Sequence, residues 1–199
     1  MGKYVAIEGI DGAGKTTICK LLSNELKNSI IIREPSDFEI GNFIRNSLKN
    51  KKDYMKNPFV STLLFFADRV STTNEIRRLK EKHDYIISDR CFLSTYAYQK
   101  ALLNNEEERK IFENLFNELL KLIEIPDLII ILDVDVEIAL QRIEKEGKAK
   151  ELYENGEFLR KVLENYRNLE LDVENVYLID ANRSIEEVKE DVIKVINLL

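Results

Sequence analysis

The chain has 199 residues, of which 44% are hydrophobic and 33% charged, so it is long enough to bury a substantial core as one domain spanning residues 1–199. Its net charge of -6 and pI near 5.1 disfavour a protein that coats nucleic acid or binds an anionic membrane surface, because either partner would repel an acidic protein. No stretch has the length of a membrane span or the pattern of an export signal, which predicts a cytoplasmic protein with neither a nucleic-acid nor a membrane partner.

The segment Gly9–Thr16, with the sequence GIDGAGKT, follows the apolar strand Tyr4–Glu8 and precedes a helical pattern. Its glycines allow a tight bend that brings backbone N–H groups close to an anion, so the segment is typical of a phosphate-binding loop. In such a loop Lys15 reaches the β and γ phosphates and the Thr16 hydroxyl binds Mg2+, while the N-terminus of the following helix adds a favourable field. We therefore expect a nucleoside triphosphate to contact the residues of the loop and the start of the helix, namely Gly9, Ile10, Asp11, Gly12, Ala13, Gly14, Lys15, Thr16 and Thr17.

Strand and helix patterns then alternate along the chain. A short strand is predicted at Ser29–Arg33, and Pro35 ends it because proline lacks the N–H group that a strand requires. A helix follows, after which the polar residues 50–57 are predicted to form a solvated loop. A long helix begins at Pro58, which suits the first turn of a helix, and its predicted inward face consists of Leu63, Leu64, Ala67 and Val70.

Phe65 and Arg69 lie four residues apart on this long helix and so share one face. One interpretation is an aromatic platform beside a guanidinium group, and the other is a core phenylalanine next to a surface arginine. The spacing by itself favours the second interpretation, because aromatic residues at helical spacing usually belong to the core.

A third strand, Tyr85–Asp89, ends in an acid that is followed at once by Arg90. Ligands of open parallel sheets bind beyond the carboxyl ends of the strands, so Asp89 and Arg90 are predicted to lie beside the phosphate loop. There Asp89 can hold the hydration shell of Mg2+, and Arg90 can bind a phosphate through two parallel hydrogen bonds. Ser94 or an earlier residue is predicted to cap the helix that follows, and residues 106–123 are predicted to form another helix.

The strand Leu128–Asp133 is almost uniformly apolar, which predicts burial on both faces. After a helix that reaches about Arg142, residues 144–156 lose the apolar pattern and become charged, which is typical of a mobile lid and also of any long surface loop. A helix at residues 157–171, a strand at Val176–Asp180 and a final helix with a capping box complete the chain. These alternations predict an α/β fold, a five-stranded parallel sheet with helices on both faces.

Five segments taken together resemble the thymidylate kinases, a family of nucleoside monophosphate kinases with a phosphate-loop fold. The resemblance covers nearly the whole chain, and the order and spacing of the segments are more specific than the phosphate loop alone. The segments are EGIDGAGKTT (Glu8–Thr17), REP (Arg33–Pro35), LLFFADR (Leu63–Arg69), SDRCFLSTYAYQ (Ser88–Gln99) and PDLIIILDVDVEIALQRI (Pro126–Ile143). The resemblance implies the P-loop nucleoside monophosphate kinase fold with a lid segment, and an enzyme that uses ATP to phosphorylate dTMP to dTDP in dTTP synthesis.

The resemblance also implies roles for individual residues on the acceptor side. Phe65 would stack on thymine with Arg69 at the polar edge of the base, Thr95 would bond the base, and Tyr98 would crowd the position of a ribonucleotide 2'-hydroxyl. Arg90 would hold the acceptor phosphate. This implication reverses the preference that spacing alone gave for Phe65 and Arg69.

On the donor side, the resemblance places ATP on the phosphate loop through Lys15 and Thr16, with Arg142 packed near adenine. Asp11 would approach the acceptor sugar and phosphate. The sequence departs from the family pattern at Cys91, where an aromatic residue or histidine is usual, and this leaves the sugar side of the site open.

Family members that lack a basic residue inside the phosphate loop carry one in the lid instead. This loop has no such base, so the resemblance makes Lys148 or Lys150 the catalytic candidate in residues 144–156. It also implies a homodimer. The alternatives left open are another P-loop nucleoside or nucleoside monophosphate kinase and, from another class, a nucleotide-switched binding protein. A GTPase switch would need a guanine-reading Asn-Lys-x-Asp stretch, and we assign none.

Overall fold

The structure is a computed structural model that describes residues 1–145 and 155–199. Five strands form one parallel sheet in the order β2-β3-β1-β4-β5, which confirms the predicted sheet. The strands are β1 (Lys3–Glu8), β2 (Ser29–Arg33), β3 (Tyr85–Asp89), β4 (Leu128–Asp133) and β5 (Val176–Asp180). The centre of the sheet consists of apolar side chains, with Val5 opposite both Ile87 and Leu128, and all three are buried. Because the strands are parallel, their carboxyl ends meet at one edge.

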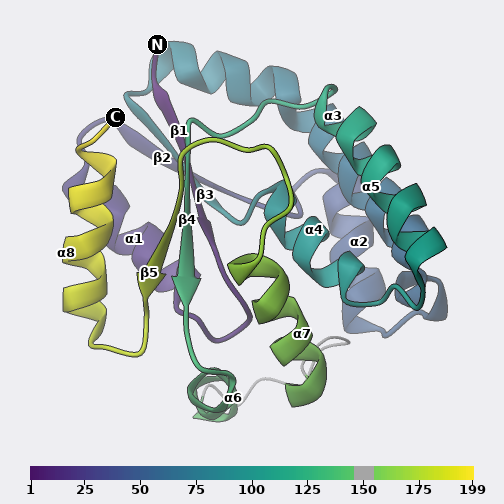
Figure 1. Cartoon of the computed structure of the whole chain (residues 1–199). Coiled ribbons are helices and arrows are strands. Elements are labelled where there is room, and N and C mark those ends of the chain that lie inside the picture. The colour runs from purple at the N-terminus through teal and green to yellow at the C-terminus, as the bar shows by residue number, and fades with distance from the viewer. Residues whose placement is uncertain (146–154) are drawn as a thin grey trace.

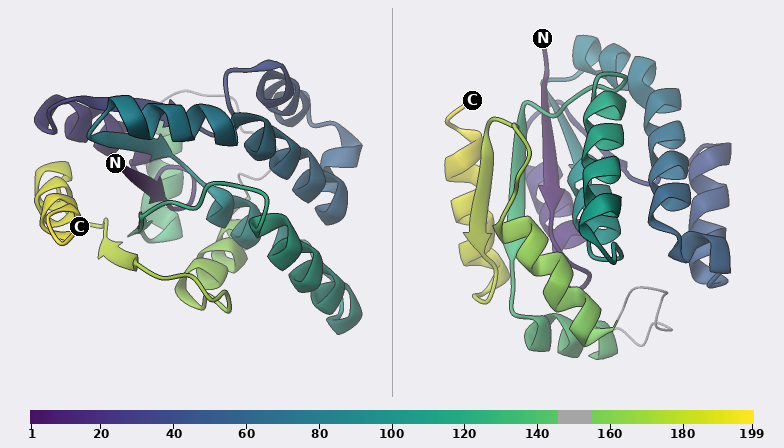
Figure 2. Two further views of the ribbon diagram at one scale, coloured as in Figure 1. Left: turned by 90° about the horizontal axis from the view of Figure 1, so that it is seen from above. Right: turned by 45° about the vertical axis from the view of Figure 1, so that its right-hand side comes forward.

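Helices cover both faces of the sheet, as predicted. Figure 1 and Figure 2 show α1 and α8 on one side of the sheet and α3, α4, α5 and α7 on the other, while α6 lies beyond the carboxyl ends of the strands. The covering helices are α1 (Lys15–Glu25), α3 (Pro58–Lys82), α4 (Phe92–Lys100), α5 (Glu106–Leu120), α7 (Gly156–Arg167) and α8 (Ile185–Ile196). Two further helices are α2 (Glu39–Lys49), which packs on α3, and α6 (Val136–Lys145). In the described parts of the chain, no helix is both long and apolar enough to cross a membrane.

The predicted inward face of α3 is wrong. Leu63 and Val70 are exposed to 50% and 44%, Ala67 is also exposed, and Leu64 is only partly buried. The buried side of the helix carries polar and charged residues together with two apolar ones: Ser61, Thr62, Phe66, Asp68, Arg69, Thr73, Ile76 and Lys80. Apolar periodicity does not indicate this face, because paired charges can be buried when their partners lie on other elements.

Three smaller boundaries also differ from the prediction. Residues 50–57 contain a short 3-10 helix, η1 (Asp53–Lys56), because Met55 turns inward and is fully buried. The helix α7 ends at Arg167 and not at residue 171, and α5 ends at Leu120. The capping box at the start of α8 is present as predicted.

Candidate functional site

The phosphate loop connects the end of β1 to α1. Gly9, Gly12 and Gly14 have positive φ angles of 137°, 80° and 98°, a backbone region that side chains disfavour. At Gly12 a Cβ atom would also lie 2.3 Å from the carbonyl oxygen of Ala139, so the loop must approach α6 without a side chain there. The loop leads directly into α1, whose N-terminus would favour a bound anion.

Lys15 begins α1 and turns back over this loop. Its side chain is 7% exposed, and its Nζ donates a hydrogen bond of 2.7 Å to the carbonyl oxygen of Ile10. Burial and the nearby charge of Arg90 lower the pKa of the Lys15 ammonium group to about 8, while Asp11 and Asp89 oppose that shift. A bound polyphosphate would favour the charged form of Lys15, since it would place negative charge beside a desolvated ammonium group.

Asp89 ends β3, and its carboxylate lies against the start of α1. The Thr16 hydroxyl donates a hydrogen bond of 2.5 Å to Oδ2 of Asp89. The structure therefore brings together the two residues predicted to bind Mg2+, although they are 73 positions apart in the sequence. Thr17, on the same turn, is exposed.

Arg90 has a strained backbone, and both its backbone N–H and its guanidinium group form hydrogen bonds. Its φ angle is 80°, and its backbone N–H donates a 3.0 Å hydrogen bond to Ile7, which holds the residue against the end of β1. Its guanidinium group bonds Ser94 Oγ at 2.9 Å, the carbonyl oxygen of Gly9 at 3.3 Å and the carboxylate of Asp11. Arg90 thus links β3 to the phosphate loop, as predicted from strand order.

Asp11 lies inside the loop and pairs with Arg90. Burial would raise the pKa of the Asp11 carboxyl, but the charges of Arg90 and Lys15 outweigh that effect and lower it. The Tyr98 hydroxyl donates to Oδ2 of Asp11 at 3.2 Å, and the backbone N–H of Asp11 donates to the same hydroxyl. Asp11 is therefore an ionised group at the junction of loop, strand and α4.

Glu8 was not predicted to take part in the site, yet it holds the first turn of α4 in place. The residue is fully buried. Its carboxylate accepts hydrogen bonds from the backbone N–H groups of Cys91 (2.7 Å) and Ser94 (2.9 Å), from Ser94 Oγ (2.7 Å) and from the Tyr166 hydroxyl (2.8 Å). The helix begins at Phe92, and Cys91 in the cap position has no side-chain capping bond. Of the predicted caps, the earlier residue Cys91 and not Ser94 occupies the cap position, and the capping group is a carboxylate 83 positions upstream.

A cavity of about 440 Å³ opens between α2, α3, α4 and the phosphate loop. All six residues predicted to bind the acceptor line it: Asp11, Phe65, Arg69, Arg90, Thr95 and Tyr98. Phe65 is half-buried, and the guanidinium carbon of Arg69 lies 5.8 Å from the centre of its ring. The structure therefore places Phe65 at the wall of a cavity and not inside the core.

Arg69 and Thr95 contact each other. Nη1 of Arg69 donates a 2.8 Å hydrogen bond to Oγ1 of Thr95. Both residues are almost completely buried, at 5% and 1% exposure. In this structure the predicted base-binding hydroxyl thus accepts a bond from Arg69, so Thr95 helps to orient the guanidinium group.

Sequence reasoning missed Arg45 and Lys49 of α2 and Gln99 of α4, which also line the cavity. Gln99 is 1% exposed, and its Oε1 atom is one of two buried side-chain polar atoms without a hydrogen-bond partner among the described residues. A buried amide oxygen without a partner is costly, so this atom is suited to accept a bond from a ligand. Gln99 directly follows Tyr98 in the segment Ser88–Gln99, so the family motif could have indicated it. Arg45 and Lys49 could not be assigned from the sequence, because the placement of α2 depends on tertiary packing.

Arg142, on α6, reaches the phosphate loop at Gly12. Its guanidinium group donates to the carbonyl oxygens of Gly12 at 3.5 Å and Ala181 at 3.1 Å. Arg142 thus bridges the loop and the segment between β5 and α8. The candidates Lys148 and Lys150, and residues 146–154 of the predicted lid, lie outside the described residues.

Comparison with known proteins identifies the family. A family profile described as thymidylate kinase matches residues 7–192 of this chain. The chain belongs to the thymidylate kinase family. A probable thymidylate kinase of Pyrobaculum aerophilum is 42% identical over 97% of this chain and 95% of its own length, and the thymidylate kinase of Buchnera aphidicola subsp. Baizongia pistaciae is 38% identical over 94% and 91%. The solved structure of thymidylate kinase from Candida albicans has a TM-score of 0.83 and 28% identity, covering 99% of this chain and 92% of that one. Both the predicted family and its P-loop nucleoside monophosphate kinase fold are confirmed.

One string of the Asn-Lys-x-Asp form does occur in the sequence, at residues 50–53. It runs from Asn50, directly after α2, to Asp53, the first residue of η1, and α2 lines the acceptor cavity. The Asn50 side chain donates to the carbonyl oxygen of Asn46 at 2.8 Å, and Asp53 pairs with Lys56 at 2.8 Å. The string forms part of a local turn, and membership of the thymidylate kinase family disfavours a guanine-reading role for it.

Proposed function

We propose that this chain transfers the γ-phosphoryl group of ATP to dTMP and so forms dTDP for dTTP synthesis. The observation that carries the proposal is the cavity of about 440 Å³ that opens beside the phosphate loop. Asp11 and Arg90 line this cavity, and Asp11 is itself a loop residue while Arg90 bonds the loop at Gly9 and Asp11. Donor and acceptor would therefore meet at these two residues. The match to the thymidylate kinase family over residues 7–192 supports the same reaction.

The chemistry of the cavity suits a pyrimidine with a carbonyl edge. Phe65 offers a stacking face, Arg69 offers N–H donors to the carbonyl oxygen at C4, and the unpartnered Oε1 of Gln99 can accept from the N–H at position 3. Cytosine presents an amino group and an unprotonated nitrogen at these two places, which leaves both protein groups without partners. Tyr98, on the sugar side, would crowd a 2'-hydroxyl.

Phosphoryl transfer requires alignment and charge neutralisation more than covalent chemistry from the protein. Lys15 would act on the charge that develops between the β and γ phosphates, and Arg90 would hold the acceptor phosphate in line with it. The acceptor phosphate is already anionic, so we assign no general base. Asp11 would orient Arg90 and the acceptor sugar through the contacts described above.

Mg2+ fits the pair Thr16 and Asp89. Their side-chain oxygens lie 2.5 Å apart at the mouth of the loop, and Mg2+ prefers oxygen ligands while keeping water and substrate phosphates in its coordination shell. The described residues contain no cluster of three or more His, Cys, Asp or Glu side chains that could hold an ion alone, which agrees with an ion that arrives with ATP. Bound there, Mg2+ would neutralise charge on the β and γ phosphates.

The other sequence predictions stay part of this proposal. The chain would act as one domain of residues 1–199, with Arg142 beside adenine and a lid of residues 144–156 that excludes water when it closes. Lys148 or Lys150 would supply the positive charge that the phosphate loop lacks. A reaction that uses ATP and supplies a dTTP precursor fits a cytoplasmic enzyme.

The deciding experiment measures ADP release with ATP, Mg2+ and a panel of acceptors. We expect dTMP to give the highest kcat/KM. The 5-methyl group adds only apolar burial, so dUMP should be about tenfold poorer, and UMP and dCMP should be poorer still. A preference for thymidine over dTMP would instead indicate a nucleoside kinase, and ADP release without an acceptor would indicate a nucleotide switch.

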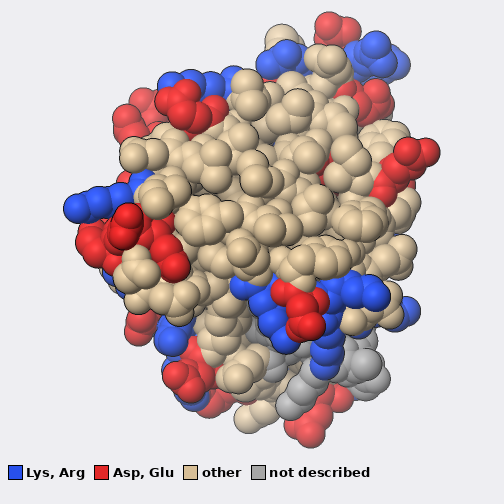
Figure 3. Space-filling view, turned by 90° about the vertical axis from the view of Figure 1, so that its right-hand side faces the viewer, with Lys and Arg blue, Asp and Glu red and all other residues tan. Residues whose placement is uncertain are grey.

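We also propose a homodimer that forms through the outer face of α3. Val60, Leu63, Ala67 and Val70 form an exposed apolar stripe along this helix, and Figure 3 shows a broad surface of uncharged side chains on this side of the molecule. Exposed apolar surfaces of this kind usually mark an interface, and a twofold axis would bring two identical stripes together.

The dimer proposal predicts that Leu63→Glu makes the protein monomeric, because it places two carboxylates in an apolar contact. Light scattering coupled to size-exclusion chromatography measures the mass directly. Leu198→Glu, which changes an exposed leucine at the far end of the chain, is the matched control and should leave the mass unchanged. A wild-type protein that is monomeric at micromolar concentration would contradict the proposal.

A further inference from the structure

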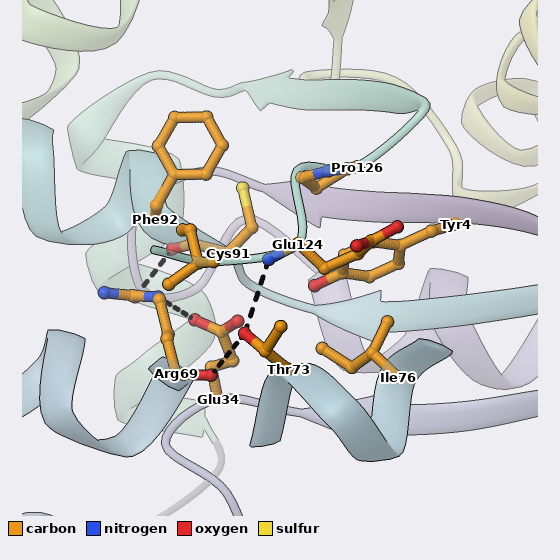
Figure 4. A pocket seen from close by; sticks show the side chains of 10 residues that line it. Tyr4, Glu34, Arg69, Thr73, Ile76, Cys91, Phe92, Glu124 and Pro126 are labelled. Carbon is orange, nitrogen blue, oxygen red and sulfur yellow. Dashed lines mark hydrogen bonds and ion pairs between the residues drawn. The ribbon is translucent and has the colours of Figure 1, made fainter. Parts of the chain in front are cut away.

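Glu34 follows the end of β2 and lies between two cavities. It lines the acceptor cavity and also a small cavity of about 10 Å³, whose lining residues, Tyr4 and Ile76 among them, Figure 4 shows. Its side chain is only 10% exposed, and its Oε2 atom accepts a 2.6 Å hydrogen bond from Nε of Arg69. A buried carboxylate is therefore paired with the arginine that the proposed function assigns to the base.

Arg69 is held at all three of its nitrogen positions. Nε bonds Glu34, Nη1 bonds Thr95 at 2.8 Å, and Nη2 bonds the carbonyl oxygen of Cys91 at 2.9 Å. A guanidinium group has five N–H donors, so one N–H on each terminal nitrogen is left over after these three bonds. Among the described residues, no acceptor takes these two N–H groups, and Arg69 lines the acceptor cavity. They are the donors that a ligand carbonyl can use.

Of the three bonds, only the one to Glu34 is charge-assisted on both sides. Thr95 and the Cys91 carbonyl are neutral acceptors, and Phe66 lies beneath the guanidinium group with its ring centre 5.4 Å from the guanidinium carbon. Charge-assisted bonds are about twice as strong as neutral ones, and a fixed carboxylate at Nε also sets the plane of the guanidinium fork. The direction of the free N–H groups therefore depends most on Glu34.

We propose that Glu34 is a positioning residue for acceptor recognition, which holds the Arg69 guanidinium group in the orientation that reads the carbonyl edge of a pyrimidine. The proposal deepens the proposed function and rests on its assignment of the cavity to a pyrimidine monophosphate. Glu34 acts through Arg69 and not on the reacting phosphates, so its effect should fall on the acceptor and spare ATP.

Glu34 also makes this positioning dependent on pH. Burial raises the pKa of the Glu34 carboxyl to about 7, against the opposing effect of Arg69, and the neighbouring carboxylates of Glu8 and Asp68 add to the increase. Tyr4 and Cys91 also face it, and burial raises the pKa of each well above its usual value. Glu124 lines the same small cavity, where it pairs with Lys80 and Arg77. Above pH 7 Glu34 is charged and pairs fully with Arg69, whereas below pH 7 it becomes neutral and the pairing weakens.

The test compares wild type with Glu34→Gln in kcat/KM for dTMP between pH 6 and pH 8.5. This parameter reports groups of the free enzyme, and the titration of dTMP itself cancels in the ratio of the two proteins. We expect wild type to exceed Glu34→Gln roughly tenfold at pH 8.5, the size of a lost charge-assisted hydrogen bond, and the ratio to approach one at pH 6. The kcat/KM for ATP should stay within twofold.

Glu124→Gln is the matched control. Glu124 lines the same small cavity from the opposite side, but it pairs with Lys80 at 3.1 Å and Arg77 at 2.9 Å. It should leave the ratio at one across the pH range. A ratio for Glu34→Gln that does not change with pH, or an equal loss for ATP and dTMP, would overturn the proposal.

Two more variants separate the possible failures. Phe65→Ala should raise KM for dTMP and spare ATP. If Phe65→Ala leaves KM for dTMP unchanged, the proposed function fails. If Phe65→Ala raises KM for dTMP but Glu34→Gln leaves kcat/KM for dTMP unchanged, only the positioning role of Glu34 is removed. Should Glu34→Gln not fold, as judged by circular dichroism, Glu34→Asp carries the test: it keeps the carboxylate, so its kcat/KM for dTMP should still rise with pH through a midpoint near that of wild type. A flat profile would overturn the proposal.

Discussion

Replacement of Lys15 by alanine is expected to lower kcat by about two to three orders of magnitude, the cost typical of losing one preorganised donor to developing charge. The ammonium group is buried at the phosphate loop, where its action is not weakened by bulk water. Stopped assays with saturating ATP and dTMP measure the effect. Folding should survive, because the replacement removes one hydrogen bond to Ile10 and relieves the burial of a charge.

Lys20→Ala is the control for this experiment, since Lys20 lies on the same helix and is exposed. It should keep kcat within a factor of two. Circular dichroism and thermal unfolding establish that both variants are folded. A folded Lys15→Ala protein with wild-type kcat would show that Gly9–Thr16 does not bind the transferred phosphoryl group.

The sheet and the donor side of the site were predictable because their signals are local. The strand Leu128–Asp133 is an almost uniformly apolar run, and Tyr85–Asp89 has Ile86 and Ile87 buried at its centre; burial on both faces of a parallel sheet favours such apolar segments. The rule that ligands bind beyond the carboxyl ends of strands then brought Asp89 and Arg90 to the phosphate loop, and the structure places them there.

Local sequence patterns did not predict which face of α3 is buried. Its apolar periodicity pointed to Leu63 and Val70, which are exposed, whereas Arg69 and Asp68 are buried. Asp68 accepts bonds from the backbone N–H and the hydroxyl of Ser36, 32 positions away. Burial of a charge depends on a partner that no local window contains, so periodicity assigned the wrong face.

The supporting residues of the site were missed for the same reason. Glu8 lies in a strand and reads as the last residue of an apolar run, yet it caps α4 from 83 positions upstream. Glu34 reads as a loop residue before proline, but it is the buried partner of Arg69. The family motifs supplied the residues that face the ligands. Glu8 and Glu34, which support those residues, could be assigned only from the packing of β1, β2, α3 and α4.

Replacement of Arg90 is expected to cause the second large loss of activity, whether alanine or glycine takes its place. Arg90→Ala and Arg90→Gly both remove the guanidinium group that bonds Gly9, Asp11 and Ser94, so kcat/KM for dTMP should fall by about two to three orders of magnitude in each. KM for ATP should change little. Arg160→Ala, at an exposed arginine of α7, is the control and should keep full activity.

The comparison between the two Arg90 variants isolates the backbone. At a φ angle of 80° alanine is strained and glycine is not, while both lack the side-chain bonds, so the glycine variant should be more stable by about 1 kcal/mol. Urea unfolding of the two proteins measures the difference directly. Equal stability would mean that the backbone is not strained at this position. Retention of kcat/KM in both variants would remove Arg90 from the acceptor site. The expected result is an equal loss of activity in both variants, with the glycine variant more stable than the alanine variant. It would show that the chain holds Arg90 in a backbone conformation that residues other than glycine disfavour, where its guanidinium group is required beside the phosphate loop.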